Sequence, residues 1–270
     1  MSKEIGLWLC LFLVSNVLWG QEWKLQKEAS CPGIDQYIID NQGNLLVALN
    51  NGELRKYNRQ GEFLLRYSPV QQSKIHEINS VTQFKTVLFY KDLQEYVLLN
   101  RYLGAPITYI LGTNGVGYVE DIGLNLQQNV WLIDMSDFSL KLIDATRGDV
   151  IERKSLAKVL DQNEVEITYF HSHQNRLYLV DRNKSILIFD TIGNFLTQWD
   201  FDKIDNVGFF MDNLYYRSGS DLVIRPLYGG EERVIPLPSV DYKKIAFSGE
   251  RLIGFSEEGF HIYHYLSETK

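Results

Sequence analysis

An internal repeat constrains this sequence more strongly than any other feature. Six short apolar runs, each preceded by a polar turn, begin 42, 43, 47, 37 and 38 residues apart. Their first residues are Leu45, Val87, Val130, Leu177, Leu214 and Leu252. Because a period of about 40 residues is typical of one β-propeller blade, the spacing predicts a closed ring of similar sheets.

Each repeat contains several further predicted strands. A second apolar run follows the first, at Leu54, Tyr96, Leu140, Ile186, Leu222 and Phe260. In five repeats a glycine comes next and introduces another apolar run; these glycines are Gly61, Gly104, Gly148, Gly193 and Gly230. We expect glycine there because it readily takes the positive φ angle that tight hairpins require. An earlier strand, which opens with an aliphatic and then a polar residue, brings each unit to four strands.

The two ends of the chain predict how the ring closes. The sixth repeat ends soon after Tyr263 without a glycine or a fourth strand, whereas residues 22–29 form a strand-like segment before the first repeat. Pairing of this N-terminal strand with the last blade would remove exposed sheet edges. We therefore predict an all-β, six-bladed β-propeller with four-stranded blades, formed as one domain by residues 21–270.

Residues 1–20 are predicted to be a signal peptide. The segment from Ile5 to Leu18 is almost wholly apolar but short for a membrane span, and Gly20 is small enough to precede a cleavage site. An uncleaved membrane anchor is the alternative. Removal of the leader takes away Cys10 and leaves only Cys31, so we expect no intramolecular disulfide. The expected location is the periplasm or cell envelope.

The charge of the chain argues against a nucleic-acid partner. The formal net charge is −7, and no stretch carries a block of like charges. Phosphate binding requires clustered Lys and Arg side chains, which this sequence does not provide.

Two repeats carry a resemblance to a known family. The first repeat reads PGID at residues 32–35, IDNQGNLLV at 39–47 and LRKYNRQGEFL at 54–64; the fourth reads LYLVD at 177–181 and ILIFDTIGNFL at 186–196. These segments resemble the NHL-type repeat of six-bladed propellers, and the chain is similar to exported propellers of unknown role in Bacteroidetes-type bacteria. The resemblance implies a fold and a general binding role, and it carries no catalytic residue across.

In the resembled fold, the innermost strand of every blade begins at one mouth of the central channel. The polar members of the six aliphatic–polar pairs would then form a ring of candidate ligand-binding residues: Asp35, His76, Glu120, Glu166, Asp205 and Asp241. Such a ring could hold Ca²⁺, another divalent ion or a cationic group. The alternative is that these residues only finish strands where the backbone meets water.

Three other segments of the sequence have a possible chemical or structural role. His171 and His173 could place two imidazoles on one side of a strand, but we expect surface histidines because no further zinc ligands are evident. The glycine-rich segment 112–117 links two β repeats and precedes no helix, so we do not expect it to bind phosphate. Residues 155–162 could form a short surface helix.

The sequence favours a non-catalytic binding or scaffold propeller of the bacterial envelope. It would recognise a protein, or another ligand, through the loops around the channel mouth, and would require no cofactor. This hypothesis predicts a filled or narrow channel and an apolar or aromatic patch on one face. The alternative is a metal-dependent hydrolase or lactonase with a divalent ion near Glu120, Glu166 and Asp205. A peptide- or glycan-binding module is a third hypothesis.

Overall fold

The computed structural model describes residues 22–82, 85–182, 184–201, 204 and 207–266. The predicted signal peptide and Asp205 of the predicted ring lie outside these ranges. Within them, the structure contains no helix with the length and hydropathy that a membrane span requires.

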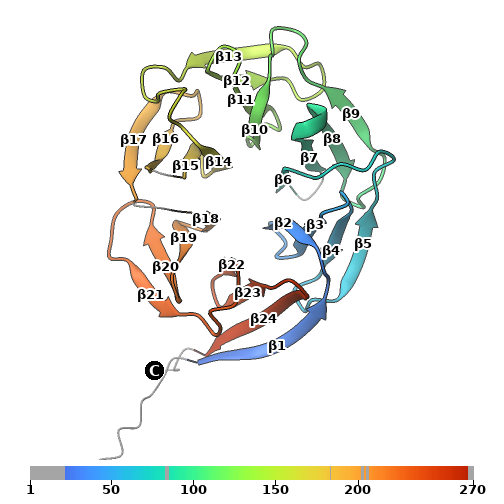
Figure 1. The fold of residues 1–270 in the computed structure, drawn as a ribbon, viewed down its shortest axis with the longest axis vertical. Coiled ribbons are helices and arrows are strands. Elements are labelled where there is room, and N and C mark those ends of the chain that lie inside the picture. The colour runs from blue at the N-terminus through green and yellow to red at the C-terminus, as the bar shows by residue number, and fades with distance from the viewer. Residues whose placement is uncertain (1–21, 83–84, 183, 202–203, 205–206, 267–270) are drawn as a thin grey trace, which may run out of the picture.

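Six four-stranded antiparallel sheets surround a central channel, so the predicted six-bladed propeller is confirmed (Figure 1). Blade one consists of β2 (Ile34–Ile39), β3 (Leu45–Leu49), β4 (Leu54–Tyr57) and β5 (Phe63–Tyr67). Blade two consists of β6 (Glu77–Thr82), β7 (Lys85–Tyr90), β8 (Glu95–Asn100) and β9 (Ile107–Ile110), with the short 3₁₀ helix η1 (Lys91–Leu93) between β7 and β8. Blade three consists of β10 (Val119–Leu124), β11 (Val130–Asp134), β12 (Ser139–Ile143) and β13 (Val150–Ser155).

The second half of the chain repeats this arrangement. Blade four consists of β14 (Ile167–His173), β15 (Arg176–Asp181), β16 (Ser185–Phe189) and β17 (Phe195–Asp200). Blade five consists of β18 (Val207–Phe210), β19 (Asn213–Ser218), β20 (Asp221–Pro226) and β21 (Arg233–Pro236). Blade six consists of β22 (Lys244–Ser248), β23 (Arg251–Phe255), β24 (Gly259–Leu266) and the N-terminal β1 (Glu22–Ser30).

The N-terminal strand closes the ring, as predicted. β1 pairs antiparallel with β24, from Trp23 opposite Tyr265 to Ala29 opposite Phe260. The Trp23 ring packs 4.8 Å from that of Tyr265, and its indole N–H donates a hydrogen bond of 2.8 Å to the carbonyl of Pro236 in blade five. The last blade is thus assembled from both ends of the chain, which leaves no open edge between blades five and one.

The apolar repeat markers all lie in the second strand of a blade, where both faces of the sheet are covered. In β3, every residue from Leu45 to Leu49 is buried. One core cluster joins Leu46 and Leu54 of blade one to Leu88 of blade two, and another joins Trp131 of blade three to Phe170 of blade four. Burial between neighbouring blades explains why these strands read as continuous apolar runs rather than alternating ones.

Polar side chains set the outer hairpins together with the predicted glycines. In blade four the Asp190 carboxylate accepts the N–H groups of Ile192 and Asn194, and Gly193 has a φ of 78°. Gly61, Gly148 and Gly230 also have positive φ angles. The prediction is wrong for Gly104, because Leu103 takes the positive φ of 55° in that hairpin. There the Asn100 side chain accepts the N–H of Gly104 and of Tyr102.

The segment predicted as a short helix, residues 155–162, is not helical. Ser155 ends β13, and the following residues form turns. Leu156 is buried, Val159 and Leu160 pack against the same core cluster, and the Leu156 N–H donates to the carbonyl of Phe138. The N–H groups of Val159 and Leu160 both donate to the carbonyl of Leu156, so the apolar residues share one hydrogen-bonded turn that does not continue as a helix.

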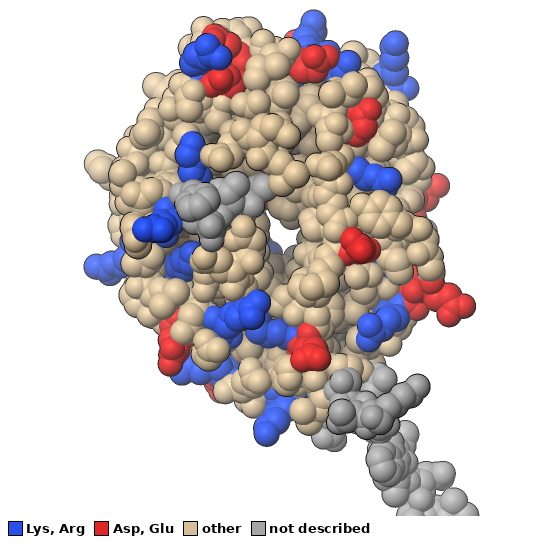
Figure 2. All heavy atoms as spheres, turned by 180° about the vertical axis from the view of Figure 1, so that it is seen from behind, with Lys and Arg blue, Asp and Glu red and all other residues tan. Residues whose placement is uncertain are grey.

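The propeller has two distinct faces. We call the face where the innermost strands begin the entry face; it also carries the turns between second and third strands, such as Asn50–Gly52 and η1. We call the opposite face the exit face; it carries the turns from first to second strands, such as Asp40–Gly43. Figure 2 shows the exit face, where the channel is open at the centre.

Candidate functional site

The predicted ring residues that the structure describes lie at the entry face, at or just before the innermost strands. Asp35 and Glu120 are the second residues of β2 and β10, whereas His76, Glu166 and Asp241 precede β6, β14 and β22. Both Asp35 and Glu120 fall at register shifts, because the pairing with the next strand skips from Ile34 to Gln36 and from Val119 to Asp121. Such bulges re-aim a side chain relative to its neighbours in the strand.

Three of the ring carboxylates have cationic partners. Glu120 forms an ion pair with Lys91 of η1, and Glu166 forms one with Arg182 in the β15–β16 turn. The carboxylate of Asp35 lies 4.0 Å from Nζ of Lys74.

The histidine of the ring is not poised to carry charge. Burial, and secondarily the Lys91 ammonium, lowers the pKa of His76, whose ring packs edge-on against Phe89 at 5.8 Å. A ring of free carboxylates therefore does not form from the members that the structure describes. Whether the ring binds a ligand stays a prediction, with Asp205 outside the described residues.

Among the described residues, no three His, Cys, Asp or Glu side chains gather as metal ligands would. Cys31 is buried and forms no disulfide. Its sulfur accepts a hydrogen bond from the Tyr57 hydroxyl at 3.4 Å.

The central channel encloses a cavity of about 1180 Å³, lined by residues of all six blades. The predicted filled or narrow channel is therefore wrong. None of the described ring residues lines this cavity. At its entry end the lining includes Arg182 and Lys244, and at its exit end it includes Asn175 and Arg251. The side chains that a ligand in the channel would meet thus differ from those that the ring hypothesis singled out.

A column of aromatic and histidine rings forms one wall of the cavity, between blades four and five. The His171 ring stacks on Tyr169 at 5.5 Å and on Phe209 at 5.6 Å, and His173 stacks on Phe209 at 4.9 Å. All four residues line the cavity. Flat rings in an enclosed channel offer broad apolar contact area, which is typical of small-molecule sites.

The prediction that His171 and His173 are surface histidines is wrong, although both do lie on one side of their strand. They belong to β14, the innermost strand of blade four, and therefore face the channel rather than bulk solvent. Burial, together with the nearby His173, lowers the pKa of His171 to about 3, so its imidazole is neutral at physiological pH. Its Nδ1 atom is buried and has no hydrogen-bond partner.

Two buried acids lie near Tyr169 of this wall. Glu77 of β6 and Asp121 of β10 are 7% and 2% exposed. Burial raises the pKa of Asp121 to about 8 and that of Glu77 well above its ordinary value, the charge of Asp121 adding to the rise. The Asp121 carboxyl accepts the N–H groups of Ile122 and, from blade four, Phe170. At neutral pH this pair holds at least one proton, so it ties blades together without filling the channel with negative charge.

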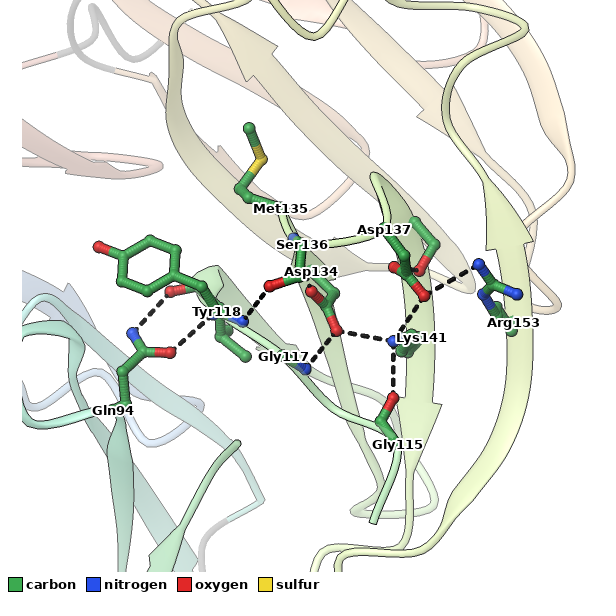
Figure 3. A network of polar contacts seen from close by, with 12 residues as sticks. Gln94, Gly115, Gly117, Tyr118, Asp134, Met135, Ser136, Asp137, Lys141 and Arg153 are labelled. Atoms are coloured by element: carbon green, nitrogen blue, oxygen red, sulfur yellow. Dashed lines mark hydrogen bonds and ion pairs between the residues drawn. The ribbon is translucent and has the colours of Figure 1, made fainter. Parts of the chain in front are cut away.

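The glycine-rich segment before β10 has a structural role (Figure 3). The Gly117 N–H donates to the Asp134 carboxylate at 2.6 Å, and the Gly115 carbonyl accepts the Lys141 ammonium at 2.7 Å. Lys141 also reaches Asp134 at 2.6 Å and Asp137 at 2.9 Å, while being only 3% exposed. The Gly117 N–H, a donor that a phosphate site would need, is therefore already used within blade three.

The sequence indicated that His171 and His173 share one side of a strand, but it did not show that this side faces the channel. The signal for the ring column is the alternation of Tyr169, His171 and His173, which places three rings on one face of a strand. Phe209 follows in the next innermost strand, two residues after Val207. Reading alternate positions of the innermost strands, rather than their first residues, would have identified the channel lining.

Comparison with known proteins supports the fold alone. The sequence matches no protein-family model and no curated protein. Among solved structures, a streptogramin B lyase is 14% identical with a TM-score of 0.59, and the match covers 86% of this chain and 79% of that one. BamB from Moraxella catarrhalis is 13% identical with a TM-score of 0.51, covering 87% of this chain and 83% of that one.

A third similar structure is the extracellular domain of a putative one-component system from B. thetaiotaomicron. It is 11% identical with a TM-score of 0.57, and the match covers 88% of this chain and 34% of that one. The similar structures include an enzyme as well as domains with no enzymatic name, so the shared architecture leaves function to the site itself.

Proposed function

We propose that this protein is a non-catalytic binding propeller that holds a ligand in its central channel. The observation that carries the proposal is the cavity of about 1180 Å³ with the stacked wall of Tyr169, His171, Phe209 and His173. A mostly preformed, concave site with aromatic walls and a few polar groups is the usual form of a small-molecule site.

The channel lining supports binding better than turnover. His171 and His173 both have pKa values lowered by burial, and His173 Nε2 is engaged with the carbonyl of Met211 at 2.7 Å. Neither imidazole contacts a carboxylate of the described residues that would orient it as a general base. The polar lining that remains includes Gln36, Thr168 and Ser172, side chains that hydrogen-bond to a ligand without reacting with it.

The proposal includes export to the cell envelope, where a protein partner could engage the loops around the channel. It is supported by the composition of residues 1–20 and by the fold similarity to a domain described as extracellular. Metal analysis of the purified chain tests the hydrolase alternative: a near-stoichiometric divalent ion that resists dialysis would favour it, with Glu120, Glu166 and Asp205 as the first residues to replace.

A bulky substitution inside the channel tests the binding site. Ser172→Phe places an extra ring among the cavity-lining residues of β14, whereas Thr197→Phe adds the same ring to the exposed outer strand β17. In a thermal-shift screen of metabolites and small glycans, ligands of the wild-type protein should lose their effect with Ser172→Phe and keep it with Thr197→Phe. Equal stabilisation of both variants by every ligand would contradict a channel site.

A further inference from the structure

The channel wall contains Lys244, whose surroundings differ from those of Lys141 in blade three. Lys244 is the first residue of β22, is partly buried and lines the cavity. Its Nζ donates a hydrogen bond to the backbone carbonyl of Asp35 in blade one. Burial lowers the pKa of this ammonium, with Lys74 nearby contributing and the Asp35 carboxylate opposing.

Within the part of the chain that the structure describes, Lys244 has no ion-pair partner at 4.0 Å or less. The nearest carboxylate in the electrostatic sense, that of Asp35, is shared with Lys74, whose Nζ lies 4.0 Å from it. A cation removed from water without a matched anion is costly, because one carbonyl dipole does not replace its hydration.

Among the described residues that line the cavity, the carboxylates lie at its exit end and have partners there. Asp40 pairs with Lys56 at 2.9 Å, and Glu250 lies 3.5 Å from Nε2 of His264. Both Asp40 and Glu250 line the cavity, on the turns of the exit face. Of the described charged residues that line its entry end, Lys244 and Arg182 are cations and none is a carboxylate, although Arg182 is paired with Glu166.

We propose that Lys244 binds the acidic group of the channel ligand, which is an organic anion with a flat apolar portion. The proposal rests on the proposed function and specifies its ligand class. A carboxylate or sulfonate beside Lys244 would supply the missing counter-charge through a charge-assisted hydrogen bond. The rest of the molecule would extend along Phe247 of the same strand toward Tyr215 and Phe209, which line the same cavity; the Phe247 and Tyr215 rings lie 5.7 Å apart.

A matched pair of fluorescent probes separates charge from ring contact. The anionic probe is 8-anilinonaphthalene-1-sulfonate, and N-phenyl-1-naphthylamine has the same rings without the sulfonate. Titrations use the whole mature chain with wild type, Lys244→Met, Lys244→Arg and Ser172→Phe. Lys74→Met, at a lysine whose side chain is 60% exposed on the same face, controls for the general loss of one positive charge.

We expect Lys244→Met to weaken the sulfonate probe by roughly tenfold or more, the size of one hydrogen bond to a charged group. The uncharged probe should change by less than about twofold, since ring burial is untouched. Lys244→Arg should restore most of the sulfonate binding, and Lys74→Met should leave both probes near their wild-type affinities. Unfolding curves of each variant confirm that the comparison is made on folded protein.

The outcomes distinguish this inference from the proposed function. If Ser172→Phe abolishes binding of both probes while Lys244→Met changes neither, the channel is a ligand site and the role of Lys244 is refuted. If Ser172→Phe leaves both probes unaffected, the channel is not their site and the proposed function loses its support. A sulfonate affinity that falls equally with Lys244→Met and Lys74→Met also overturns the inference, because it shows that only the total positive charge of this face matters.

Discussion

Two lysines of this propeller are withdrawn from water in different ways. Lys141 of blade three is 3% exposed and meets two carboxylates, Asp134 and Asp137, together with the carbonyl of Gly115. Lys244 in the channel wall meets the carbonyl of Asp35 and no carboxylate within 4.0 Å among the described residues. The first charge is satisfied inside the protein and fixes a loop, whereas the second is left for something that enters the channel.

The comparison suggests how structural and functional charges can be told apart in a repeat fold. Both lysines occupy β-strands of similar blades, with Lys141 buried and Lys244 partly buried. The difference is whether carboxylates within the protein neutralise the ammonium group. A completed network adds order to one blade, while an incomplete one beside a cavity marks a place where a ligand group could complete it.

The largest expected effect comes from breaking the blade-three network. Lys141→Met would leave Asp134, which is fully buried, without its cation, and we expect a loss of about 3–5 kcal/mol in the free energy of unfolding. Urea denaturation followed by tryptophan fluorescence measures it. Lys158→Met, at an exposed lysine near the end of the same blade, is the control and should cost less than about 0.5 kcal/mol. A loss below 1 kcal/mol with Lys141→Met would mean that the network adds little stability.

The acid pair beside the channel should produce the next largest effect, visible as a pH dependence. The pKa of Asp121 is about 8 in the fold, against 3.8 ordinarily, so the folded protein keeps a proton that the unfolded chain releases as pH rises between these values. The stability of the wild type relative to Asp121→Asn should therefore fall by about 1.4 kcal/mol per pH unit, or about 3 kcal/mol from pH 5 to pH 7.

Comparing the variant with the wild type at each pH cancels contributions from other titrating groups. Glu77→Gln should show the same direction, because its carboxyl is also held protonated by burial. A stability difference that stays constant between pH 5 and pH 7 for both variants would show that the pair is ionised in the fold.

A smaller effect is expected at the histidine of the ring column. His171→Phe keeps a flat ring and removes a buried Nδ1 atom that has no partner, so we expect a gain of about 1 kcal/mol at pH 7.5. The pKa of His171 is lowered to about 3 in the fold. Below pH 6.5 the unfolded chain therefore binds a proton at this imidazole that the folded chain does not bind. The gain should therefore grow by about 1 kcal/mol between pH 6.5 and pH 5.5. A gain that shrinks on acidification would show that His171 is charged in the fold.

The smallest effect on stability is expected at Lys244. Removal of its charge by Lys244→Met leaves none of the described buried carboxylates unpaired, so the free energy of unfolding should stay within about 1 kcal/mol of wild type or rise slightly. The same denaturation experiment places this variant beside Lys141→Met. Equal losses at both sites would remove the distinction between a structural and a ligand-directed lysine.

The residues themselves were sufficient to predict much of the architecture. The apolar runs at Leu45, Val130 and Leu177 fall in strands buried on both faces, and burial of that kind leaves a continuous run that can be read without a structure. The missing fourth strand after Tyr263 and the unassigned segment at residues 22–29 predicted the shared last blade, because a lone sheet edge is unstable. The first signal recurs along the sequence, and the second is a departure of the last repeat from that pattern, which is why both could be found.

The tertiary structure alone decided which side chains face the channel and what each one meets. The bulges at Asp35 and Glu120 and the cationic partner Lys91 come from strand register and from a neighbouring blade, neither of which a spacing reveals. The partners of Lys141 lie within or beside its own hairpin, whereas Lys244 touches a carbonyl 209 positions away. Sequence determined the strands, since each depends on its own residues; the site required the closed ring, because its walls are contributed by every blade.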